Sequence, residues 1–250
     1  MLKIPVLLLL YLTLTQCRPS YNVDLTGILD PDMALVNIEQ SDRASLGELL
    51  KKIDSCKPAV IAINVYFTLE KDRAGDSILM SSLRSINNDL LIYWINPEDG
   101  KLMDSSHTKF SGLATECRTG YEVVMGLKSY MVPVETIEGT THELLPLKIV
   151  QLWKPGFKHD LKNNEWIAIH FTRTLDQYYH INGSDFNVKK LADKLKNKII
   201  ILGYTGPGKE DKFFTPIRLE KNYPDSEPDT YGSVILANAI RTILEYEIKQ

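Results

Sequence analysis

Short apolar runs alternate along the chain with segments whose apolar residues repeat at helical spacing. The run Ile199–Leu202 is β-branched and bounded by lysines and a glycine, which is typical of a strand buried on both faces. Residues 34–39 and 59–65 predict two further strands of this kind. Between them, leucines and an isoleucine at i, i+3, i+4 and i+7 over residues 46–53 predict an amphipathic helix, which Ser41 or Asp42 can cap.

The same alternation continues toward the C-terminus. Asp76 opens a second predicted helix, and residues 90–95 form a third predicted strand. This β-α-β-α-β order requires a parallel sheet with right-handed crossovers. The remaining predictions are a hairpin or edge strands at 121–125 and 129–137, a turn and short helix at 142–153, a strand at 166–171, and helices at 188–195 and 233–248. We therefore predict an α/β fold, with a mostly parallel (mixed) central sheet, helices on both faces and a single domain.

The N-terminal residues 1–17 have the pattern of a signal peptide. Lys3 supplies a positive charge, and the apolar stretch 5–15 is too short to cross a bilayer comfortably as a helix. The sequence around Cys17 resembles the lipobox of bacterial lipoproteins, although Gln16 stands where a small residue is expected. We predict export to the cell envelope or periplasm with a lipid on Cys17; an uncleaved membrane anchor and simple secretion are the alternatives.

Export would permit disulfide bonds, because the compartments outside the cytosol are oxidising. With Cys17 acylated, Cys56 and Cys117 remain as a possible pair, and a buried free thiol is the plain alternative. The net charge of −3 over 250 residues argues against a nucleic-acid partner, since no basic excess is present to bind phosphates.

The glycine-rich stretch after the strand at 199–202 matches part of the P-loop motif of nucleotide-binding proteins. Gly203–Lys209 fits G-x-x-x-x-G-K, but Glu210 replaces the Ser or Thr that ligates magnesium, and Pro207 removes a backbone donor. We therefore predict no nucleotide binding. No cofactor or metal is expected either, because no two of the histidines have the spacing of a zinc site; these are His107, His142, His159, His170 and His180.

Six polar residues lie at or just after the C-terminal ends of predicted strands, or begin the helices after them. In a parallel sheet all of them reach the same C-terminal edge, where open α/β sheets place their ligands. A cleft of mixed charge there suits a small polar or zwitterionic ligand, and Arg43 could bind its carboxylate. The alternative is that these residues cap helices and neutralise one another. The six are Glu39, Arg43, Asn64, Asp76, Thr205 and Asp211.

These patterns together resemble the CHASE-type sensory domains of the second class, extracellular domains associated with cyclases and histidine kinases. The stretch LVNIEQSDRASLGELLKKI resembles the family's first strand and helix start, and KPAVIAINVYF its second strand. KIIILGYTG with Asp211 to Pro216 (DKFFTP) resembles its most specific block, and GSVILANAI its final helix. Two residues depart from the family pattern: Asn64 replaces an acid and Leu236 replaces a histidine.

The resemblance runs from about Ala34 to Leu244, and we assign residues 22–250 to the domain. It implies an extracytoplasmic sensory domain that binds an unidentified small molecule. Family members normally continue into membrane helices and an output domain, so we expect a detached domain whose signal passes to a membrane partner protein. It implies no enzymatic activity. The alternative is an envelope hydrolase or transferase using Glu39 and Asp211 as acid and base, but the spacing shows no nucleophile–base pair.

Overall fold

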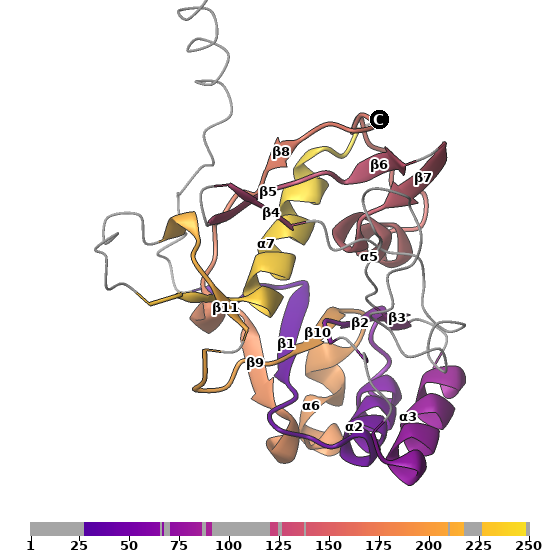
Figure 1. The fold of residues 1–250 in the computed structure, drawn as a ribbon. Helices are drawn as coiled ribbons and strands as arrows, with labels where there is room; N and C mark the ends of the chain where they lie inside the picture. The colour runs from indigo at the N-terminus through magenta and orange to yellow at the C-terminus, as the bar shows by residue number, and fades with distance from the viewer. Residues whose placement is uncertain are drawn as a thin grey trace, which may run out of the picture.

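A five-stranded parallel sheet forms the centre of the protein (Figure 1). The structure is a computed structural model, and it describes residues 28–65, 67, 71–86, 89–91, 121–124, 127–137, 139–209, 211–217 and 227–248. The strand order is β3-β2-β10-β1-β9. The bounds are β1 Met33–Asn37, β2 Val60–Ile63, β3 Asp89–Leu91, β9 Tyr179–Asn182 and β10 Ile199–Gly203.

Strand β10 lies at the middle of the sheet, between β1 and β2. Its apolar run is buried on both faces, as the sequence predicts. Ile199 and Ile201 belong to the core on one face of the sheet, whereas Ile200 and Leu202 belong to the core on the other. This division follows from the period of two in a strand, which sends successive side chains to opposite faces.

Three helices cover one face: α2 (Arg43–Ser55), α3 (Arg73–Ser85) and α6 (Val188–Leu195). The Asp42 side chain caps α2 by accepting from the Ser45 amide at 2.7 Å, which confirms one of the two predicted caps. The second helix begins three residues earlier than predicted. Its cap is Asp72, which accepts from the Gly75 amide at 2.6 Å, so Asp76 lies in the first turn.

The opposite face is covered by α5 (Leu145–Trp153) and α7 (Gly232–Glu245). The sequence predicts that a single stripe of α7 docks on the sheet. The structure instead buries residues on nearly every side of this helix, including the polar Ser233, Asn238 and Thr242. Helices on both faces of a parallel sheet in one domain confirm the predicted fold class.

Smaller antiparallel elements surround this centre. The predicted hairpin region forms strands, as expected, but the strand predicted at 166–171 is reduced to residues 167–168 and pairs outside the central sheet. The bounds are β4 Tyr121–Val124, β5 Leu127–Met131, β6 Val134–Ile137, β7 Thr140–Glu143, β8 Ile167–Ala168, β11 Lys212–Phe213, β12 Thr230–Tyr231, and the 3₁₀ turns η1 Leu175–Gln177 and η2 Gly183–Asp185.

Cys56 is a free and buried thiol whose Sγ lies 3.5 Å from the Lys52 carbonyl oxygen, and burial raises its pKa. Of the two alternatives for this residue, the structure therefore has the free thiol. Cys17, Cys117 and His107 lie outside the described residues. Within the described part of the chain, every helix is too short or too polar to cross a bilayer.

Candidate functional site

The connections that leave the sheet diverge at the C-terminal end of β10. The chain passes from β1 to α2 and from β2 to α3 on one face, whereas after β10 it leads through β11 and β12 to α7 on the other. Strand β10 therefore lies between β1 and β2, and its connection crosses one face of the sheet while theirs cross the other. This is the switch point at which open α/β sheets bind ligands.

Asn37, the last residue of β1, connects three segments at this edge. Its Oδ1 accepts hydrogen bonds from the backbone amides of Glu39 and Thr205, each at 3.0 Å. Its Nδ2 donates to Oδ1 of Asn182, the last residue of β9, at 3.1 Å. Sequence reasoning missed Asn37, although a single polar residue ending the apolar strand ALVN could have drawn attention to it.

Glu39 and Thr205 are the predicted site residues that Asn37 holds in place. Glu39 has a positive φ of 53°, and its carboxylate accepts from the Ser184 amide at 2.9 Å and the Ser184 hydroxyl at 3.1 Å. The buried Thr205 hydroxyl shares a hydrogen bond of 2.7 Å with Nε2 of His180. Partial burial lowers the pKa of His180, which favours the neutral imidazole at pH 7.

Arg43 and Asp76 form an ion pair between the first turns of α2 and α3. Arg43 Nη1 lies 2.5 Å from Asp76 Oδ1, and both side chains are buried. The guanidinium also lies 5.2 Å from the centre of the Phe67 ring, and the Lys71 amide donates to Asp76 Oδ2 at 3.2 Å. These contacts are the mutual neutralisation that the sequence left open as the alternative to ligand binding.

Asn64 and Ser233 both lie beside Gly203, the last residue of β10. Asn64 is half-buried, and its backbone amide donates to the Leu202 carbonyl at 2.7 Å. A Cβ atom at Gly203 would lie 2.1 Å from the Ser233 Oγ, so a side chain at this position would displace α7. The Ser233 hydroxyl is buried and makes no hydrogen bond among the described residues. Such an orphaned hydroxyl is uncommon in a folded protein.

The Asp211 side chain lies beside Gly232, the first residue of α7. A Cβ atom at Gly232 would come within 2.8 and 2.9 Å of the two Asp211 carboxylate oxygens, so glycine allows this close approach. The Gly232 amide donates to the Asp211 backbone carbonyl at 3.0 Å. The dipole at the N-terminus of α7 stabilises a negative charge here.

The glycine loop after β10 folds against two tyrosines. The Tyr231 hydroxyl donates to the Gly206 carbonyl at 2.7 Å, and the Gly208 amide donates to the Tyr204 hydroxyl at 3.3 Å. The segment after Lys209 forms β11 instead of a helix. The loop therefore lacks the strand–loop–helix geometry that a P-loop requires.

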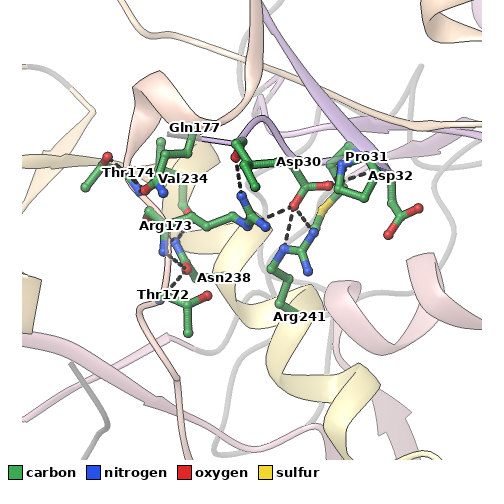
Figure 2. A network of polar contacts seen from close by, with 12 residues as sticks. Asp30, Pro31, Asp32, Thr172, Arg173, Thr174, Gln177, Val234, Asn238 and Arg241 are labelled. Carbon is green, nitrogen blue, oxygen red and sulfur yellow. Dashed lines mark hydrogen bonds and ion pairs between the residues drawn. The ribbon is translucent and has the colours of Figure 1, made fainter. Parts of the chain in front are cut away.

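A second polar network, at the opposite edge of the sheet, joins the segment before β1 to α7 (Figure 2). The Asp30 carboxylate is inaccessible to solvent and pairs with Arg241 through Nε and Nη2; Arg173 Nε lies 3.4 Å from it. Its other oxygen accepts from the amides of Asp32 and Met33, each at 2.9 Å. Burial, with the charge of Asp30, raises the pKa of Tyr178 beside this network.

Asn238 extends this network from the middle of α7. Its Oδ1 accepts from the amides of Thr172 and Arg173 at 3.0 and 3.1 Å, and its Nδ2 donates to the Arg173 carbonyl at 2.9 Å (Figure 2). Sequence reasoning missed Asp30, Arg173 and Arg241; only Asn238, a polar residue inside an apolar helix, gives a signal in the sequence. The network is structural, because its members bind one another.

The described residues contain no cluster of three or more His, Cys, Asp or Glu side chains that could hold a metal ion. The six predicted residues thus lie around the end of β10 in two groups. Glu39, Thr205, Asn64 and Asp211 surround the end of the strand itself, and the Arg43–Asp76 pair joins the two helices on one face.

Comparison with known proteins agrees with this architecture. The CHASE2 domain family matches residues 13–250, which is nearly the whole chain. Neither a curated protein nor a solved structure gave a significant match. CHASE2 domains are extracytoplasmic, bind small molecules and signal to associated output domains. The chain belongs to the CHASE2 family of extracellular sensory domains.

Proposed function

We propose that this protein senses a small polar molecule outside the cytoplasm, binds it around the C-terminal end of β10, and passes the signal to a partner protein in the envelope. One observation carries this assignment. Ser233, an orphaned buried hydroxyl, lies next to Gly203 at the switch point, and the carboxylates of Glu39 and Asp211 follow β1 and β10 at the same edge of the sheet. A ligand donor would satisfy the hydroxyl, which has no partner in the described part of the chain.

The side chains at this edge favour a ligand with hydroxyl or amine donors. Glu39 and Asp211 are hydrogen-bond acceptors when ionised, and the neutral imidazole of His180 adds a polar group at the surface. A ligand carboxylate would have to displace Asp76 from Arg43, and that pair is buried. We therefore assign a structural role to Arg43 and Asp76: their ion pair holds α2 against α3. Both Glu39 oxygens accept from Ser184, an arrangement that favours binding over acid–base catalysis.

A metabolite screen by thermal shift tests this site. We expect a polar compound that raises the melting temperature of the wild type and binds about tenfold more weakly to Ser233→Ala, the scale of one lost hydrogen bond to a buried group. Removal of an orphaned hydroxyl should change the stability of the free protein little. Glu39→Gln and Thr205→Val should weaken binding in the same way.

Ser77→Ala is the matched control, because Ser77 is exposed on α3 and its hydroxyl donates only to the Arg73 carbonyl of its own helix. Its affinity for the compound should equal that of the wild type. A compound whose affinity is the same in all three site variants would show that the ligand binds elsewhere. A screen that finds no stabilising compound at all would count against the sensory assignment.

We also propose that a lipid on Cys17 anchors the protein to the membrane; this residue lies outside the described part of the chain. Cys17→Ser should abolish labelling by a clickable fatty acid and release the protein from the membrane fraction. Cys117→Ser is the matched control and should keep both properties. Unchanged labelling and retention in Cys17→Ser would mean that another segment holds the protein.

A further inference from the structure

A cavity of about 290 Å³ lies between the η1 turn, the β11–β12 hairpin and the first turns of α7. None of the proposed ligand-binding residues at the end of β10 lines it. Its volume is at the lower end of the range for small-molecule sites, which limits an occupant to a compact molecule. The cavity is therefore a second candidate binding site with its own set of side chains.

Two opposite charges line this cavity without pairing. The Lys212 ammonium lies 4.8 Å from the centre of the Tyr231 ring, and the Asp176 carboxylate accepts a hydrogen bond from the Thr174 hydroxyl. Among the described residues, neither Lys212 nor Asp176 has an ion-pair partner within 4 Å, although the charge of Lys212 contributes to lowering the pKa of Glu227. A cation and an anion that face one small space, but do not neutralise each other, complement a ligand carrying both charges.

The rest of the lining adds one more carboxylate and an apolar floor. Asp229 Oδ1 accepts from the hydroxyls of Thr230 and Thr215 at 2.8 and 3.3 Å, which fixes the orientation of the carboxylate. Apolar contact area comes from Leu175, Ile217 and Val234. Hydrophobic walls with a few placed polar groups are the usual composition of a small-ligand site.

We propose that this cavity binds a small α-amino acid with an apolar side chain. Lys212 pairs with the ligand carboxylate, Asp176 pairs with its ammonium group, and the apolar floor contacts its side chain. The two charged contacts orient the molecule, and the volume excludes larger peptides. This site goes beyond the proposed function, since it uses different residues and does not depend on ligand binding at the end of β10.

Calorimetric titration of the whole protein with L-leucine, L-valine and L-phenylalanine tests the ligand class. We expect at least one of them to bind at micromolar to millimolar concentrations. Two neutralised probes report the two charges separately: N-acetyl-L-leucine lacks the ammonium, and L-leucinamide lacks the carboxylate. Each should bind about tenfold or more weakly than L-leucine, because one charge-assisted contact is lost. Absence of binding by all three amino acids, or equal binding of either neutralised probe, would overturn the assignment.

Variants locate the site. Lys212→Met and Asp176→Asn should each weaken binding about tenfold or more, whereas the controls Lys190→Met and Asp185→Asn, on other surface elements, should not. Ser233→Ala should also bind the amino acid normally. Loss of binding in Ser233→Ala with retention in Lys212→Met would overturn this cavity and support the site at β10 instead. Should Asp176→Asn fail to fold, Lys212→Met and the two neutralised probes still decide the question.

Discussion

Replacing Arg43 with alanine is expected to lower the free energy of unfolding by about 3–5 kcal/mol. The guanidinium lies 2.5 Å from Asp76, whose side chain is only 1% exposed, so the substitution leaves a carboxylate buried without its counter-charge. It also removes the contact with the Phe67 ring that packs beside the pair. For a chain of this length, the loss corresponds to a decrease in melting temperature on the order of 10 °C, measurable by calorimetry or circular dichroism.

The double variant Arg43→Met/Asp76→Leu separates the cost of the unpaired charge from the value of the pair. Because apolar residues of similar volume often replace a buried ion pair at little cost, this variant should recover most of the lost stability. Arg73→Ala is the control, since Arg73 is an exposed arginine at the start of α3. A melting temperature of Arg43→Ala within one or two degrees of the control would mean that the pair contributes little to architecture and is free to serve a ligand.

Replacing Asp30 with alanine should also cost at least about 3 kcal/mol. Its carboxylate is fully buried and is shared by Arg241 and Arg173, while its second oxygen caps the amides of Asp32 and Met33 at the start of β1. The two arginines reach solvent in part, which offsets some of the cost of leaving them unpaired. Chemical denaturation should show a lower midpoint with a similar slope.

The Asp30→Asn variant separates the contribution of the negative charge from that of the hydrogen bonds to the two backbone amides. Asparagine keeps an oxygen for the two amides but loses the attraction of the arginines, so its stability should lie between those of the wild type and Asp30→Ala. Asp32→Ala is the control; this half-buried neighbour takes part in no ion pair in the described part of the chain, and the change should stay within about 0.5 kcal/mol. Equal stabilities of Asp30→Ala and Asp32→Ala would contradict a structural role for the network.

Much of the fold follows from the order of apolar and polar residues. The runs that became β1, β2 and β10 are predictable because a strand buried on both faces needs apolar side chains in succession. The stripe and the cap of α2 are equally local signals. Since parallel strands end at one edge, the sequence also determines that Glu39, Asn64 and Thr205 lie near each other.

Strand β9 was missed, and its composition explains why. In the sequence YHIN only Ile181 is buried, because the strand lies at the edge of the sheet. Its extended conformation depends on pairing with β1 and not on local propensity. The paired residues are about 145 positions apart in the chain; Asn182, for example, pairs with Asn37. Periodicity describes the neighbourhood of a residue along the chain and carries no information about such long-range pairs.

Because periodicity carries no information on long-range pairs, the sequence by itself determined only part of the candidate sites, and the tertiary structure decided the rest. The sequence determined the family, the sheet edge and the six polar residues that reach it. The tertiary structure decided that Arg43 pairs with Asp76, that Ser233 is buried beside Gly203, and that Lys212 and Asp176 face one cavity. These relations depend on distances between segments that lie far apart in the sequence and meet only in the folded protein. The free energy of a charge or hydroxyl depends on its partners and its burial there, and neither can be inferred from neighbouring residues in the chain.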